Sequence, residues 1–104
     1  MKIGIIGAGN MGGAIARGLA AGSKVAAADI TVCSPNRRGE LDALKAEYPD
    51  INVSVDNEAA VSGTDMIILA VKPWLLDEVM DALKMKIDFG RQMLVSIVAG
   101  ATLE

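Results

Sequence analysis

Histidine is absent from the 104 residues, and cysteine, tryptophan, tyrosine and phenylalanine occur once each. The lack of histidine removes the commonest general base and the commonest metal ligand, so chemistry is left to carboxylates, lysine, tyrosine, hydroxyl groups or a bound cofactor. A single cysteine excludes a disulfide within the chain and favours a reducing, cytoplasmic location. Because Cys33 lies in an apolar run, we expect a buried and inert thiol.

The sequence also lacks a basic tract and an apolar stretch of membrane-spanning length. A formal charge of −3, with mixed signs along the chain, argues against nucleic acid as a partner. A transmembrane helix needs about 20 apolar residues, and no run approaches that, so we expect no membrane association. Residues 1–104 are therefore expected to form one soluble domain, too short for a second lobe of comparable size.

Aliphatic residues and glycine are what the sequence does contain, with 52% hydrophobic residues and 11 glycines. Short apolar runs alternate with segments of helical period, which predicts an α/β, three-layer Rossmann-type fold with a mainly parallel sheet and helices on both faces. The expected strands cover residues 3–6, 30–33, 52–55, 66–71 and 93–98. The first expected helix covers residues 11–21, and a second is marked by Leu41, Leu44 and Tyr48. A short third helix, capped by Asp56 or Asn57, runs through Val61. The helical spacing of apolar residues over 75–83 predicts a fourth. Met66, Met80 and Met93 fall on core positions of this pattern.

A glycine-rich segment follows the first expected strand and opens the first expected helix. It reads Gly7-Ala8-Gly9-Asn10-Met11-Gly12 and matches G-x-G-x-x-G in the context that makes this pattern informative. Gly7 permits the tight turn, Gly9 lets the backbone approach a pyrophosphate, and Gly12 lets the helix pack on the strand. The segment predicts dinucleotide binding, with phosphate held by the helix N-terminus.

The end of the second expected strand favours NADP(H) over NAD(H), with NAD(H) still possible. An acidic residue about twenty positions after the glycines would accept hydrogen bonds from the ribose of NAD, and none occurs there. The sequence instead supplies hydroxyl, amide and guanidinium groups, which are good phosphate donors. The candidates are Ser34, Asn36 and Arg37, with Arg37 favoured over Arg38 although the sequence does not separate them.

Two further segments are expected at the carboxyl edge of the sheet, where ligands of open α/β sheets bind. The first is Ala70-Val71-Lys72-Pro73, in which the backbone of Ala70 and Val71 would line the nicotinamide side. Lys72 would either steer an anion or be an ordinary exposed lysine. The second is the segment from Ser96 to Gly100. Trp74 could shield the site, although covering the core beneath a helix is the favoured expectation.

Together these motifs resemble pyrroline-5-carboxylate reductase over the full chain. The pieces are the glycine segment, Ser34-Pro35, Asn57-Glu58, the Ala-Val-Lys-Pro edge and the closing Ser96-Ile97-Val98-Ala99-Gly100-Ala101-Thr102. The resemblance implies reduction of 1-pyrroline-5-carboxylate to L-proline with NAD(P)H, in proline biosynthesis. It implies cofactor contacts from the glycine segment, Ser34, Asn57 beside the adenosine, and residues 70–73, and we add Ala99 and Gly100 as candidates. No catalytic side chain is assigned, because a protonated C=N bond already accepts hydride readily.

The resemblance also implies a further domain that lies outside residues 1–104. Family members continue into an all-helical carboxyl-terminal domain that supplies the dimer interface and the substrate pocket. We therefore expect the chain to be the amino-terminal part of a homo-oligomeric enzyme and to be inactive alone. Two alternatives stay open: a deazaflavin-dependent NADP reductase domain, and a non-catalytic nucleotide-sensing Rossmann module. The Ala99-Gly100-Ala101-Thr102 ending argues against the first and Ser34-Pro35 against the second.

Overall fold

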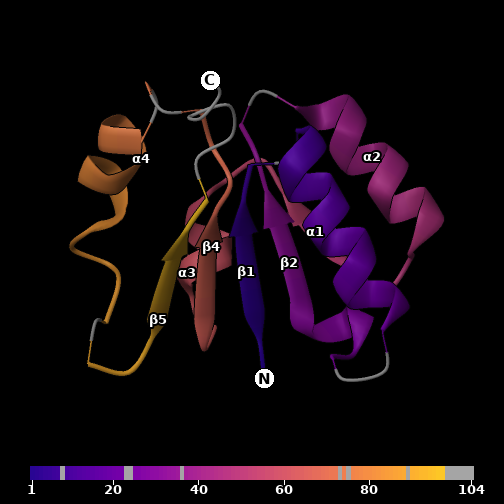
Figure 1. The fold of residues 1–104 in the computed structure, drawn as a ribbon, viewed down its shortest axis with the longest axis horizontal. Helices are drawn as coiled ribbons and strands as arrows, with labels where there is room; N and C mark the ends of the chain where they lie inside the picture. The colour runs from indigo at the N-terminus through magenta and orange to yellow at the C-terminus, as the bar shows by residue number, and fades with distance from the viewer. Residues whose placement is uncertain are drawn as a thin grey trace.

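The computed structural model describes residues 1–7, 9–22, 25–35, 37–72, 74, 76–88 and 90–97. These residues form a parallel five-stranded sheet in the order β3-β2-β1-β4-β5 (Figure 1). The strands are β1 (Ile3–Ile6), β2 (Ile30–Cys33), β3 (Asn52–Ser54), β4 (Met66–Leu69) and β5 (Met93–Ser96). The helices are α1 (Asn10–Ala21), α2 (Arg38–Glu47), α3 (Glu58–Val61) and α4 (Leu76–Leu83), with a short 3₁₀ turn at Ala27–Asp29.

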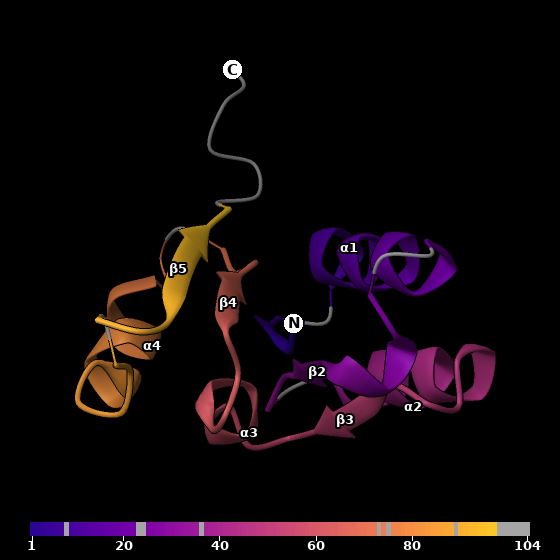
Figure 2. The ribbon, with the colours of Figure 1, turned by 90° about the horizontal axis from the view of Figure 1, so that it is seen from below.

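Helices cover both faces of the sheet, as Figure 2 shows along the strands. α1 and α2 lie on one face, and α3 and α4 lie on the other. Alternate residues of β1 point to opposite faces, so Ile5 packs in the core under α1 and α2 while Ile6 packs in the core under α3 and α4. The predicted three-layer α/β fold is confirmed. No helix in the described part of the chain has the length and apolar character needed to cross a membrane.

Several elements are shorter than the sequence pattern predicts. β4 ends at Leu69, not at Val71, because its neighbour β1 ends at Ile6, the register partner of Leu69. β3 ends at Ser54 and β5 at Ser96, while Val98 lies outside the described residues. The helices differ at their ends as well: α1 begins one residue earlier than predicted, at Asn10, and α2 ends at Glu47 with Tyr48 as its cap.

Two expected core residues are exposed. Met93 is 58% exposed, because it begins the edge strand β5, which has a neighbour on one side only among the described strands. Trp74 is 74% exposed, because it follows the end of β4 and lies beyond the sheet, so the expectation that it covers the core is wrong. Met66 and Met80 do pack against the two cores, as predicted.

Cys33 is fully buried at the end of β2, as predicted for an inert thiol. Burial raises the pKa of this thiol from 9.0 to about 11. The negative charge of Asp56 raises the pKa further, and a hydrogen bond with the backbone of Ala60 opposes the shift. The native protein therefore holds the thiol proton to higher pH than the unfolded chain does.

This difference predicts a loss of stability at alkaline pH. Below pH 9 both states keep the proton and the thiol contributes fully, whereas between pH 9 and 11 only the native state keeps it, so the free energy of unfolding falls. We expect the wild type to lose roughly 2 kcal/mol more than Cys33→Ala over this range. Urea unfolding of both proteins at pH 8 and pH 11 measures the difference. Parallel pH profiles for the two proteins would contradict the prediction.

Candidate dinucleotide-binding site

The order of the strands places a crevice beside the end of β1. The chain passes from β1 to β2 on one side, whereas β4 pairs with the opposite side of β1. The order in which successive strands are added to the sheet therefore reverses at β1. In open α/β sheets this reversal leaves a crevice outside the carboxyl ends of the strands, and ligands bind there. Figure 1 shows these ends together at the top of the sheet, next to the beginning of α1.

The turn after β1 is tied to both neighbouring strands. The backbone N–H of Gly7 donates to the carbonyl of Cys33 at 2.7 Å, and the N–H of Ala70 donates to the carbonyl of Ile6 at 2.9 Å. Gly7 has φ of 111°, a conformation that side chains with a Cβ rarely adopt. The chain therefore turns away from the sheet at a fixed point, as the glycine pattern predicts.

Gly12 and Gly9 have opposite surroundings. A Cβ on Gly12 would overlap the carbonyl of Gly7, so α1 sits directly on the turn only because residue 12 has no side chain. A Cβ on Gly9 would meet nothing within 4 Å. Gly12 is thus required for packing inside the protein, whereas the space at Gly9 is open to a ligand.

The first turn of α1 contains no acidic residue that would repel an anion. Gly9 occupies the N-cap position without a side-chain hydrogen bond. The first helical hydrogen bond runs from the N–H of Gly13 to the carbonyl of Gly9 at 2.8 Å. The N–H groups of residues 10–12 precede that bond and, with the helix dipole, favour a phosphate.

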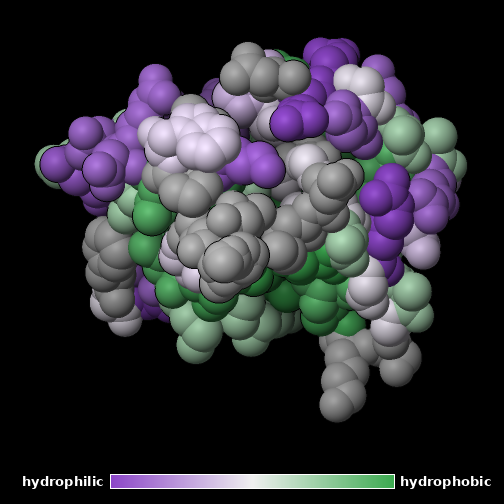
Figure 3. Space-filling model, turned by 45° about the horizontal axis from the view of Figure 1, so that its top comes forward, coloured by the Kyte–Doolittle hydropathy of each residue, from purple (hydrophilic) through white to green (hydrophobic). Residues whose placement is uncertain are grey.

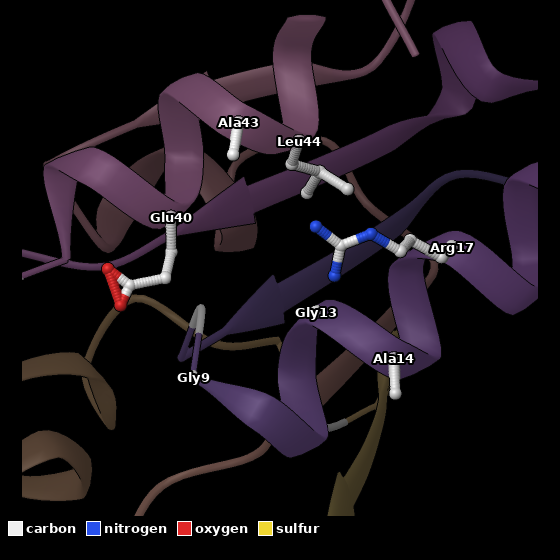
Figure 4. Close-up of a pocket in the computed structure, with 7 residues that line it drawn as sticks. All are labelled: Gly9, Gly13, Ala14, Arg17, Glu40, Ala43 and Leu44. Atoms are coloured by element: carbon white, nitrogen blue, oxygen red, sulfur yellow. The ribbon is translucent and has the colours of Figure 1, made fainter. Parts of the chain in front are cut away.

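A pocket of about 340 Å³ lies between α1 and α2, next to the glycine turn (Figure 4). Its lining residues are Gly9, Gly13, Ala14, Arg17, Glu40, Ala43 and Leu44. The Nε of Arg17 donates to Glu47 at 2.7 Å and links the two helices. Arg17 and Glu40 were not predicted as site residues, although the four-residue spacing of Gly9, Gly13 and Arg17 places them on one helix face.

The two arginines at the start of α2 lie in different surroundings. Arg37 is the N-cap residue of α2 and pairs at 3.3 Å with Glu40, a residue that lines the pocket containing Gly9. Arg38 pairs with Asp42 at 3.7 Å and lines a separate depression with residues of β3. The two arginines thus differ in their ion-pair partners.

Ser34 and Asn57 complete the side of the crevice next to β2. Ser34 is buried, and its N–H donates to the carbonyl of Ser54 at 3.1 Å, which extends the pairing of β2 with β3. Asn57 is the N-cap residue of α3, but the side chain that accepts the N–H of Glu58, at 3.0 Å, is that of Asp56. The Oδ1 atom of Asn57 is buried and has no hydrogen-bond partner among the described residues.

The other side of the crevice follows β4. Ala70 is buried, Val71 packs against the core under α3 and α4, and Lys72 is exposed. The N–H of Ile97 donates to the carbonyl of Leu69 at 2.8 Å, which carries the chain after β5 toward the same edge. Of the predicted contacts, Ala8, Asn36, Pro73, Ala99 and Gly100 lie outside the described residues.

The surface around this edge is divided by polarity. In Figure 3, hydrophilic residues gather above α4 and α2 at the two sides, and hydrophobic residues lie below them.

Among the residues that the structure describes, no group of three or more cysteine or acidic side chains could hold a metal ion.

Comparisons with known proteins agree with this geometry. A family model described as NADP oxidoreductase coenzyme F420-dependent matches residues 2–100. Pyrroline-5-carboxylate reductase 3 of Danio rerio is 33% identical over 103 residues, covering 99% of this chain and 34% of that protein. The pyrroline-5-carboxylate reductase of Methanosarcina acetivorans is 37% identical over 109 residues, covering 98% of this chain and 37% of that protein. The chain thus spans about a third of the length of these relatives.

Solved structures show the same likeness. A pyrroline-5-carboxylate reductase from Coxiella burnetii superposes with a TM-score of 0.84 at 29% identity, over 97% of this chain and 36% of that one. The pyrroline carboxylate reductase of Plasmodium falciparum, solved with NADP bound, gives a TM-score of 0.74 at 26% identity, over 94% of this chain and 33% of that one.

The glycine turn at the reversal of strand order, followed by an uncapped helix start, defines a Rossmann-type domain of the dinucleotide-binding class. The match over residues 2–100 shows further that the chain belongs to the family of NADP oxidoreductases described by that model. The resemblance to pyrroline-5-carboxylate reductases is confirmed by relatives that align with nearly the whole chain.

The contact between Gly12 and the turn generates a stability prediction. Gly12→Ala would force a Cβ against the carbonyl of Gly7, so we expect a loss of about 3 kcal/mol or more in the free energy of unfolding. Gly18→Ala is the matched control, because it lies in the same helix with nothing within 4 Å, and it should stabilise the protein by about 0.5–1 kcal/mol. Urea denaturation followed by circular dichroism measures both changes. Equal effects of the two substitutions would disprove this account of the turn.

Proposed function

We propose that this chain is the NADP(H)-binding part of a pyrroline-5-carboxylate reductase, able to take NAD(H) as well. The observation that carries the proposal is the open space at Gly9 above an uncapped helix start, in a turn anchored to β2 and β4. A pyrophosphate placed there would receive the free N–H groups of the first turn of α1. The named relatives supply the substrate class.

The remaining predicted residues take roles according to their places around the crevice. Arg37, next to the pocket at Gly9, would meet the 2′-phosphate of the adenosine with Ser34 and Asn36. The Oδ1 atom of Asn57, which has no hydrogen-bond partner among the described residues, would lie beside the adenosine. On the other side of the turn, residues 70–73 would line the nicotinamide, with Ala99 and Gly100 close to it. Arg38, which pairs with Asp42, is the less favoured candidate for this contact.

The reaction proposed for the whole enzyme is the reduction of 1-pyrroline-5-carboxylate to L-proline. A bound nicotinamide cofactor would supply a hydride to the carbon of the protonated imine, so that the C=N double bond becomes a C–N single bond and the ring nitrogen keeps its proton. These residues contribute placement of the nicotinamide, for which no histidine base is needed. We propose that the substrate pocket and a homo-oligomeric interface belong to a carboxyl-terminal helical domain, and that the chain alone binds cofactor without turnover.

The description of the matching family favours a second candidate, a domain that exchanges hydride between NADP(H) and a deazaflavin. Both candidates require NADP(H) in the same crevice and differ in the partner of the hydride. The relatives named pyrroline-5-carboxylate reductase cover 98–99% of the chain, and their number favours the pyrroline substrate. A nucleotide-sensing module gains no support from these relatives.

Titration with NADPH tests the cofactor proposal. We expect saturable binding to the 104-residue chain in calorimetry, with quenching of the exposed Trp74 as a second readout. Gly9→Ala should lower the affinity at least about tenfold, because the added methyl group occupies the space needed by the pyrophosphate. It should lower stability by no more than about 1 kcal/mol, since the site is open within the protein.

Gly18→Ala is the control, because it adds the same methyl group to α1 away from the turn. This variant should bind NADPH like the wild type. The proposal fails if the wild type gives neither heat nor quenching, or if Gly9→Ala binds as tightly as Gly18→Ala.

A further inference from the structure

Glu40 places a carboxylate at the pocket beside the glycine turn. It lies in the first turn of α2 and lines the same pocket as Gly9 and Arg17 (Figure 4). Its side chain is 46% exposed, so it is accessible to a ligand that enters from the carboxyl edge of the sheet. The end of β2 lacks an acidic residue, and Glu40 brings one to the same region from the next helix.

The charges around Glu40 are arranged in two pairs. Arg37 lies 3.3 Å from the Glu40 carboxylate, while Arg17, across the pocket, is bound to Glu47 at 2.7 Å. Within the described residues that line the pocket, Glu40 is therefore the acidic group and Arg17 the basic group, and Arg17 is already neutralised by Glu47. A 2′-phosphate held by Arg37 would therefore also meet the Glu40 carboxylate, because the two side chains form an ion pair.

We infer that Glu40 is a specificity-determining residue that limits the preference for NADPH over NADH, an inference that rests on the proposed function. A 2′-phosphate carries about two negative charges, so it is repelled by the Glu40 carboxylate and must compete with it for Arg37. The 2′-hydroxyl of NADH is neutral and can donate a hydrogen bond to the same carboxylate. The Glu40 carboxylate therefore weakens the binding of NADPH and is compatible with the binding of NADH.

The test compares Glu40→Gln with Asp42→Asn. Both substitutions remove one negative charge from an exposed ion pair in α2, but Asp42 pairs with Arg38 and lines the separate depression next to β3. Dissociation constants for NADPH and NADH are measured by calorimetry at low salt and again with about 0.5 M added salt, which screens the interactions between exposed charges. Thermal unfolding by circular dichroism verifies that the variants remain folded.

We expect Glu40→Gln to strengthen NADPH binding about two- to fivefold, because the substitution removes one repulsive interaction between exposed charges. NADH binding should stay equal or weaken, so the ratio of the two dissociation constants shifts toward NADPH. The shift should shrink at high salt, and Asp42→Asn should leave the ratio close to that of the wild type. The inference is overturned if the ratio in Glu40→Gln is unchanged, or if Asp42→Asn moves it equally. A wild type that binds neither nucleotide would overturn the proposed function itself, together with this inference.

Discussion

The close approach of the Gly7 carbonyl to residue 12 is the constraint on which the site depends. It requires a residue without a side chain at position 12 and a positive φ at Gly7, and it brings the start of α1 directly onto the end of β1. Hydrogen bonds from the turn to Cys33 and from Ala70 to Ile6 fix this point relative to β2 and β4. The helix start is therefore held by backbone contacts, which leaves its free N–H groups in a constant position.

This arrangement separates the residues that build the site from those that select the ligand. The buried strands β1, β2 and β4 and the packing of Gly12 on the turn fix the start of α1, where we propose that a pyrophosphate lies. Arg37 and Glu40 lie on the exposed surface of α2, where pairing energies are small. Under the proposed roles of these residues, a change in the exposed charges would alter which dinucleotide binds while the fold stays the same.

The sequence predicted the architecture well because strand, turn and helix each leave a local signal. The apolar runs of β1, β2 and β4 predict the layers, and the glycine spacing predicts the turn between β1 and α1. The ends of β4 and β5 were overestimated, since pairing with a neighbouring strand, and not hydrophobicity, determines where a strand stops. Trp74 and Met93 were misplaced because their exposure depends on the sheet edges, which composition does not reveal.

The part of the site that sequence reasoning missed comes from contacts between helices. Arg17 and Glu40 are distant in the chain and line one pocket because α1 and α2 pack side by side on one face of the sheet. An acidic residue at the end of β2 is the usual determinant of NAD(H) binding in such domains, and no acidic residue occurs at that position here. Since α2 begins four residues after Ser34, its first turn reaches the same region, so a carboxylate there can take part of the role of a residue at the strand end. The inference for Glu40 thus makes the cofactor preference depend on the packing of α1 and α2 as well as on the end of β2.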